Sequence, residues 1–301
     1  MQFILLLLLP LAAHAFHLHC PSPAISFRPF TSFRLPTSLH DKPPETENLS
    51  NPNLSNPNLY GRFLSISVPA FIQLTAEPLA SLVDTAFIGR LGPSALGGAG
   101  VAISAQYALS KLYNDPLLKT SISLVATADA DPTSTAESLS TAISTALILA
   151  AVIGVAQFLF YFTLAPKILK SMAVPASSSM FPSAFSYLRL RSLGSPAATL
   201  WLVSNGIFRG LGDTKTPLVY ALLFTSLNVL LDPLFVFTLN FGAGGAALAT
   251  SLSQTVALVP LLYTLHKRIG LKKPENLAKS IEAYLVAGGA VLIRTIAKVG
   301  L

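Results

Sequence analysis

Long apolar runs alternate with short polar or charged connections from about residue 62 onward. No residue is charged from Ser138 to Pro166, and Asp232 is the only formally charged residue from Thr216 to His266. A bilayer-spanning helix needs roughly 20 mostly apolar residues, so the second stretch has room for two such helices and a turn. The pattern predicts six membrane-spanning helices, at about residues 64–89, 95–126, 140–165, 184–208, 217–239 and 244–265.

Two of the predicted helices carry unusual charge. Lys111, Asp115 and Lys119 interrupt the second helix, which is the least hydrophobic of the six. A seventh helix begins near residue 281, but Arg294 and Lys298 leave it only a short apolar stretch. We therefore do not expect the seventh helix to cross a bilayer alone.

The composition agrees with a membrane protein. Hydrophobic residues make up 52% of the chain and charged residues only 11%, whereas a soluble domain has about 25% charged residues. The fold class predicted is therefore an all-α integral membrane protein, with the lipid bilayer as its surroundings. The net charge of +7 comes from basic residues between apolar spans, as is typical of membrane proteins. Because no basic stripe with interleaved aromatic residues occurs, we expect no nucleic-acid partner.

The N-terminal 61 residues differ from the rest of the chain. No acidic residue precedes Asp41, while basic and hydroxylated residues are frequent, which is typical of an organellar transit peptide. A short apolar run ending in a small-x-small pattern also permits a secretory signal. We interpret residues 1–45 as a targeting segment, and the Asn- and Pro-rich residues 46–61 as a disordered linker. The single cysteine, Cys20, excludes an internal disulfide.

A polar stripe runs along the first predicted helix. Gln73, Glu77 and Asp84 follow each other at i, i+4 and i+11, which places them within about 40° of one another around the helix axis. Ionisable groups inside a span usually face a bundle interior or a water-filled cavity. The alternative is that Asp84 only caps a loop while Glu77 bonds a neighbouring helix.

The fifth predicted helix repeats this theme. Thr225, Asn228 and Asp232 share one face at i, i+3 and i+7, and Pro233 follows directly. A proline inside a span frees backbone carbonyl groups, and these could coordinate a cation beside the carboxylate. The alternative is a helix end at the Asp-Pro pair, although the following residues remain apolar.

Such carboxylates suit ion-coupled transport. Burial disfavours the charged form of a carboxyl group, so its protonation depends on nearby water, sodium or a cationic solute. The chain has no phosphate-binding G-x-x-x-x-G-K-[ST] loop, and its histidines offer no metal site. No nucleophile, base and oxyanion donors converge, so we do not expect an enzyme. The only small ion expected is the coupling ion, H+ or Na+, with no other cofactor.

Four motifs in order resemble those of the multidrug and toxic compound extrusion (MATE) family, in its plant plastid-type branch. They are Val83 to Gly92, the loop Phe208 to Pro217, Asn228 through Pro233, and Gly244 to Thr250. The resemblance covers about residues 60–301. It implies two lobes of six helices that export small organic solutes, xenobiotics or metabolites, in exchange for H+ or Na+ across a plastid membrane.

The resemblance also implies roles for single residues. Asp84 matches the proton or cation site of the family, and Asn228 and Asp232 match a polar pair of the fifth helix. We therefore predict a cation- or proton-binding network of Asp84, Asn228, Asp232, Thr250 and Tyr187, to which the stripe adds Glu77 and Gln73. Pro69 matches a proline at which the first helix bends.

The family pattern has twelve helices. Residues 62–268 resemble its N-terminal lobe, and residues 269–301 correspond to a loop and the start of the seventh helix. We accordingly expect transport to need a second lobe or a homo-oligomer. The alternative is a non-transporting truncated fragment, or a half-transporter subunit that needs a partner lobe. A lipid-linked precursor flippase would instead have a large basic cavity, whereas the predicted interior is acidic and amidic.

Overall fold

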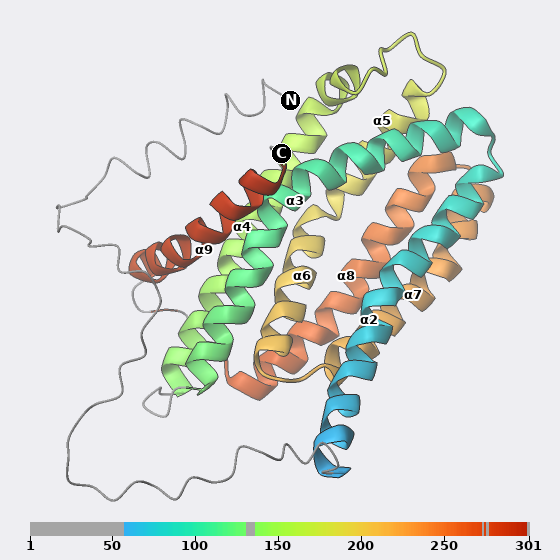
Figure 1. Cartoon of the computed structure of the whole chain (residues 1–301). Helices are drawn as coiled ribbons and strands as arrows, with labels where there is room; N and C mark the ends of the chain where they lie inside the picture. Colours follow the sequence, from blue (N-terminus) through green and yellow to red (C-terminus); the bar gives the residue numbers. More distant parts are fainter. Residues whose placement is uncertain (1–56, 131–135, 273, 275–276, 300–301) are drawn as a thin grey trace, which may run out of the picture. The chain divides into compact units, whose positions relative to one another are not determined.

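The computed structural model describes residues 57–130, 136–272, 274 and 277–299, and every regular element among them is helical (Figure 1). This confirms the predicted all-α class. The helices are α2 (Pro57–Gly89), α3 (Pro93–Ala130), α4 (Ala136–Ser171), α5 (Phe181–Leu193), α6 (Ser195–Gly210), α7 (Lys215–Pro233), the π-helical η1 (Leu234–Thr238), α8 (Gly242–Ile269) and α9 (Leu277–Val299). The predicted targeting segment and residues 46–56 of the predicted linker lie outside the described residues.

Four helical stretches among the described residues are long and apolar enough to cross a membrane. They are Phe63–Gly89, Ala136–Ser171, Lys215–Thr238 and Gly242–Ile269, and they match the first, third, fifth and sixth predicted spans. Large apolar side chains on their surfaces are exposed: Phe71 is 68%, Leu230 69% and Val259 64% exposed. Apolar surface of this extent belongs in lipid or against protein rather than in water.

The remaining two predicted spans are less regular. Helix α3 is a single long helix that contains both Pro116 and the charged residues. The predicted span 184–208 is divided at Gly194 into α5 and α6. Pro196 lacks a backbone N–H and cannot continue the hydrogen-bond ladder of α5. The structure therefore does not confirm six uninterrupted spans.

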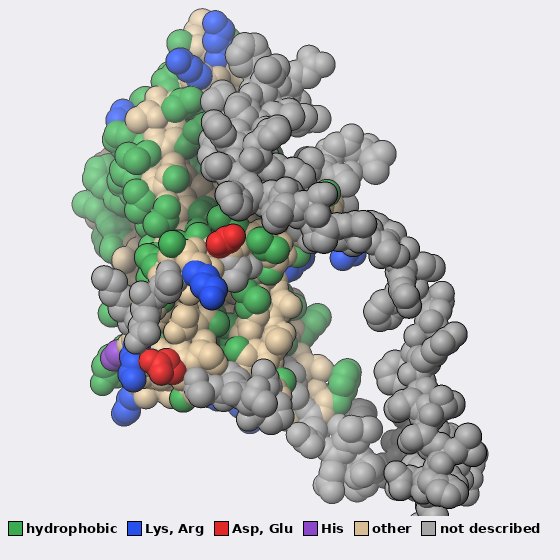
Figure 2. All heavy atoms as spheres, turned by 90° about the vertical axis from the view of Figure 1, so that its left-hand side faces the viewer, with side chains coloured by type: hydrophobic (Ala, Val, Ile, Leu, Met, Phe, Trp, Pro, Cys, Tyr) green, Lys and Arg blue, Asp and Glu red, His purple; other side chains and the backbone are tan. Residues whose placement is uncertain are grey.

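The helices form one bundle in which neighbours in space are often distant in sequence (Figure 1). Helix α2 packs along α7, α7 packs along α8, and α5 packs on α8, α3 and α4. Helix α9 packs on α3 and α4, where the Tyr284 hydroxyl donates to the Leu117 carbonyl at 2.8 Å. Figure 2 shows apolar side chains gathered at the upper left of the bundle, with charged side chains at its upper end, in the middle and at its lower end.

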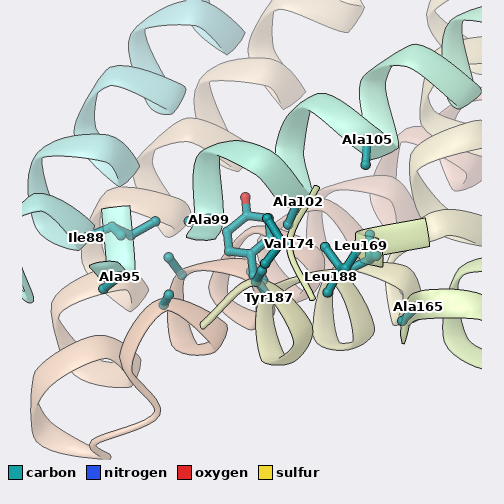
Figure 3. Close-up of a cluster of buried hydrophobic side chains, with 14 of the residues drawn as sticks. Ile88, Ala95, Ala99, Ala102, Ala105, Ala165, Leu169, Val174, Tyr187 and Leu188 are labelled. Atoms are coloured by element: carbon teal, nitrogen blue, oxygen red, sulfur yellow. The ribbon is translucent and has the colours of Figure 1, made fainter. Parts of the chain in front are cut away.

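Small residues bring the helices close together around the first of two apolar clusters (Figure 3). The Tyr187 ring of α5 lies among Ala99 and Ala102 of α3 and Val174, and it is only 4% exposed. Alanine and glycine allow close approach of helices in membrane proteins. The cluster holds α5 and α8 beside the end of α2 that carries Asp84.

Candidate ion-binding site

Asp84 lies in α2, one turn before the helix ends at Gly89, and is 7% exposed. Its Oδ1 accepts a hydrogen bond of 2.6 Å from Asn228 Nδ2 of α7. Its Oδ2 accepts one of 3.3 Å from Thr250 Oγ1 of α8. Three helices thus supply the side chains around one carboxyl group, and Asp84 is more than a loop cap.

A second carboxyl group joins this network from α7. Asn228 and Asp232 are one turn apart and fully buried, and Asn228 Nδ2 also lies 3.3 Å from Asp232 Oδ2. The Asp84 and Asp232 carboxyl groups thus have the Asn228 amide as a common hydrogen-bond donor. One amide therefore bridges two buried carboxyl groups that could share a proton.

Three polar oxygens on the same face of α7 are buried and have no hydrogen-bond partner among the described residues. They are Thr225 Oγ1, Asn228 Oδ1 and Asp232 Oδ1. A buried acceptor without a donor is energetically unfavourable, and such atoms need a specific explanation. A bound proton or an oxygen-liganded cation would satisfy the carboxylate and amide oxygens.

The backbone around Asp232 is helical beyond the proline. After Pro233 the chain continues as the π-helix η1 to Thr238 rather than ending at the Asp-Pro pair. Single π-helical turns inside helices are frequent at functional sites. Helix α8 approaches η1 so closely that a Cβ on Gly245 would lie 2.6 Å from the Phe235 carbonyl oxygen. This contact fixes the start of α8, and with it Thr250, beside α7.

Tyr187 of α5 lies beside the network. It is 4% exposed and belongs to the same apolar cluster as Ile88, one turn after Asp84 in α2. The structure thus joins Asp84, Asn228, Asp232 and Thr250 by hydrogen bonds, and Tyr187 lies in the adjoining apolar cluster. Pro69 lies within α2, as the predicted bending position requires.

Gln73 belongs to a different polar cluster. Its Nε2 donates to Asn205 Oδ1 of α6 at 2.8 Å, and its Oε1 accepts from Arg209 Nη2 at 3.3 Å. Eleven residues of helix separate Gln73 from Asp84 by about 16 Å along the axis. The structure therefore does not place Gln73 in the Asp84 network. Glu77 lies between them on α2, but its side chain is outside the described residues.

Three residues of these clusters were not predicted: Asn205, Arg209 and Arg191. Asn205 is 6% exposed inside an apolar helix, which is a signal that the sequence does contain. Arg191 is a charged residue within a predicted span, another such signal. Their partners, however, come from distant parts of the chain and follow only from the packing of the helices.

The chemistry open to the site is the binding of a small cation. No group of three or more His, Cys, Asp or Glu side chains in the described part of the chain could hold a metal ion. A sodium ion would therefore have to use amide and hydroxyl oxygens besides the two carboxyl groups, as hard cations do. A proton needs only the carboxyl pair.

Comparison with known proteins decides the family. The protein-family model MatE matches residues 134–234. Arabidopsis thaliana Protein DETOXIFICATION 44, chloroplastic, is 37% identical over 78% of this chain and 46% of its own length. Protein DETOXIFICATION 45, chloroplastic, of the same plant is 35% identical over 85% of the chain and 49% of its own length. The chain belongs to the MATE family. The chain spans about half the length of these curated relatives.

Solved MATE structures share the fold of this chain. A MATE transporter in complex with MaD3S has a TM-score of 0.66 and 25% identity, over 78% of this chain and 53% of its own. MATE in the bent conformation has a TM-score of 0.65 and 26% identity, over 77% and 52%. The chain is therefore a multi-pass membrane protein of a family of transporters rather than enzymes. The chloroplastic relatives agree with the predicted plastid membrane.

Proposed function

We propose that the chain is the ion-binding lobe of a secondary antiporter that exports small organic solutes in exchange for H+ or Na+. Asp84 and Asp232 would carry the ion, and Asn228, Thr250 and Tyr187 would complete the binding network. The observation that carries this proposal is the pair of buried carboxyl groups bridged by one Asn228 amide. The Asp232 oxygen without a hydrogen-bond donor among the described residues supports it further.

Electrostatics explains how such a pair could exchange ions. Two ionised carboxylates side by side in a low-dielectric interior repel each other, and each also loses its hydration. A proton or Na+ removes part of this charge, and a cationic solute that approaches the pair competes for the same charge. Binding of the ion and binding of the solute then oppose each other, which is the requirement for exchange.

We also propose that transport requires a second lobe or a second copy of the chain. The matched solved structures are about twice as long as the matched region. Alternating access in many transporters is a movement of one repeat against another around a site near the bilayer midplane. The exposed apolar side chains of α2 and α7, among them Phe71 and Leu230, offer surface for such a contact or for lipid.

The proposal is tested with the chain reconstituted in proteoliposomes under an imposed pH or Na+ gradient, with ethidium as the fluorescent cation. With a second copy of the chain acting as the second lobe, we expect gradient-dependent ethidium movement by the wild type and background movement by Asp84→Asn. Asp129→Asn is the matched control, because Asp129 is exposed near the end of α3. Equal activity of Asp84→Asn and wild type would refute the carrier role.

Ion binding is measured separately on the same samples. Isothermal titration calorimetry with NaCl measures Na+ binding, and a pH indicator measures the protons released when Na+ is added. Both measurements detect ion binding at the site whether or not ethidium moves. We expect binding by the wild type and by Asp129→Asn but not by Asp84→Asn. Ion binding without ethidium movement would refute antiport by this chain alone, and absence of both would refute the site.

A further inference from the structure

Arg191 is a cation inside a predicted membrane span, and the proposed ion exchange does not yet use it. It lies in α5 and is partly buried. Its Nη1 donates to Ser251 Oγ, and its Nη2 donates to Gln254 Oε1, both at 3.4 Å. Both partners are buried, neutral side chains of α8. Ionisable residues inside membrane helices are expensive and usually mark a functional site.

Two short routes connect Arg191 to the carboxyl pair. On α8, Ser251 directly follows Thr250, whose hydroxyl donates to Asp84. On α5, Arg191 lies one turn after Tyr187, which belongs to the same buried cluster as Ile88, one turn after Asp84 in α2. The guanidinium and the Asp84 carboxyl group therefore contact consecutive residues of α8, Ser251 and Thr250.

Other charged groups on the helices around Arg191 have different surroundings. The guanidinium of Arg189 lies 4.1 Å from the centre of the Phe162 ring and 5.2 Å from that of Phe185. Arg209 of α6 donates to Gln73. The charged side chains of α3, α4 and α8 are exposed or pair with each other: Lys111, Asp115, Lys119, Asp129, Glu137, Lys167, Lys170, His266, Lys267 and Arg268. Among the described charged side chains, Asp84 is thus the one whose hydrogen-bonding partner on α8, Thr250, directly precedes Ser251, the partner of Arg191.

We propose that Arg191 is the fixed positive charge against which the Asp84–Asp232 pair releases its proton, a positioning role that rests on the proposed function. With one shared proton, the two carboxyl groups and the guanidinium together are neutral. After the proton leaves, the site carries one net negative charge. A single monovalent cation then restores neutrality, so Arg191 sets a one-for-one exchange of a proton for Na+ or a singly charged solute.

Two other roles for Arg191 fit the observations less well. As a tie between α5 and α8 it would be weak, because both hydrogen bonds are long and their acceptors are neutral. As a binding group for an anion it would be opposed by the neighbouring carboxyl pair. A fixed charge needs neither short hydrogen bonds nor an anionic ligand.

The test is infrared difference spectroscopy of the chain in lipid bilayers, with the protonated carboxyl C=O band followed against pH. Asp84→Asn and Asp232→Asn assign the band. Arg191→Gln removes the charge and keeps hydrogen-bonding capacity. In Arg191→Gln, the C=O band of the protonated carboxyl group should persist to a pH about one unit higher than in the wild type. A unit charge at the distance of one or two side chains shifts the pKa of a carboxyl group by about that amount. Arg191→Lys keeps the charge and should titrate close to the wild type.

Controls separate charge from folding. Arg189→Gln removes a cation from the same helix, but the Arg189 guanidinium faces aromatic rings. The midpoint of the titration, which is the pH at which half of the carboxyl C=O band is lost, should therefore be the same in Arg189→Gln and in the wild type. Gln254→Glu neutralises the guanidinium without removing it and should raise the midpoint as Arg191→Gln does; it serves if Arg191→Gln does not fold.

The outcomes distinguish this inference from the proposed function. A wild-type midpoint in both Arg191→Gln and Gln254→Glu would overturn the role of Arg191. An equal shift of the titration midpoint in Arg191→Lys and Arg191→Gln would overturn it too. The planar shape of the guanidinium group, and not its charge, would then determine the midpoint. If the midpoint shifts as expected but the wild type moves no ethidium, antiport by the chain fails and the role of Arg191 stands.

Discussion

Asp213 caps α7 from the loop that joins α6 to α7, and Asp213→Ala removes all of its contacts at once. Its Oδ1 accepts from the backbone N–H groups of Lys215 and Thr216, both at 3.0 Å. Its Oδ2 accepts from Thr216 Oγ1 at 2.8 Å and from Arg268 Nη1 of α8 at 2.6 Å. The residue thereby ties the start of the helix that carries Asn228 and Asp232 to the end of α8.

The magnitude follows from the kind of each contact. Loss of an N-terminal cap costs about 1 kcal/mol. The ion pair is partly exposed, with 47% of the Arg268 side chain and 17% of the Asp213 side chain accessible, so it adds at most about 1 kcal/mol. We expect Asp213→Ala to lower the free energy of unfolding by about 2 kcal/mol in total. Asp213→Asn keeps an acceptor for the backbone and should lose about half as much.

The contribution of Asp213 depends on pH. Partial burial of its carboxyl group opposes ionisation, but hydrogen bonds from Thr216, Arg268 and Lys215 outweigh this and hold its pKa below the usual value. A lowered folded-state pKa stabilises the fold at pH values above the unfolded pKa of about 3.9. This stabilisation is lost as the pH falls through the folded-state pKa. The difference between wild type and Asp213→Ala should therefore be constant between about pH 5 and 7 and shrink below about pH 4.

The assay is reversible unfolding in mixed detergent micelles, followed by the fluorescence of the single tryptophan, Trp201, which is 2% exposed. Arg268→Gln and the double variant isolate the ion pair in a double-mutant cycle. A loss below about 0.5 kcal/mol for Asp213→Ala, which is typical of an ordinary surface position, would refute the capping role. So would a difference that grows on acidification.

The same unfolding assay tests two further contacts. Gly245→Ala should lower the free energy of unfolding by about 1–3 kcal/mol, because the new Cβ meets backbone atoms of η1. Gly100→Ala is the control and should be neutral or stabilising, because a Cβ there has nothing within 4 Å. Equal effects of the two substitutions would contradict the close packing of α8 on η1. Gln73→Leu should cost about 1–3 kcal/mol because it leaves the Asn205 acceptor without its donor. Thr75→Val is its control, since the Thr75 hydroxyl bonds only carbonyls of its own helix; a loss no larger than in that control would argue against the Gln73 contact.

The family resemblance predicted the centre of the candidate site, and sequence periodicity added residues that do not belong to it. The spacing of Asn228 and Asp232 places both on one face of α7, and the apolar surroundings of Asp84 required a polar partner. The rotation of about 100° per residue shows which residues share a face of a helix, but it does not show which of them lie close together along the helix axis. Gln73 therefore shares a face with Asp84 but meets Asn205 of α6, about three turns away from Asp84.

The fold was predictable where apolar runs are long and uninterrupted, as in α4 and in α7 with η1. The bend at Gly194 was missed because apolar residues continue on both sides of it, although Pro196 signals it. The position of Arg191 beside the carboxyl pair could not be predicted, since it depends on how α5 packs on α8. Such contacts between distant segments arise only from the assembled bundle.

The central claim is that a buried Asp84 carboxyl group binds the coupling ion with Asn228 and Asp232. Its most direct test is gradient-driven ethidium movement in proteoliposomes, compared for wild type, Asp84→Asn and Asp129→Asn at equal protein abundance. With a second copy of the chain as the second lobe, we expect movement by the wild type and by Asp129→Asn, and background movement by Asp84→Asn. Movement by Asp84→Asn at the wild-type rate would contradict it.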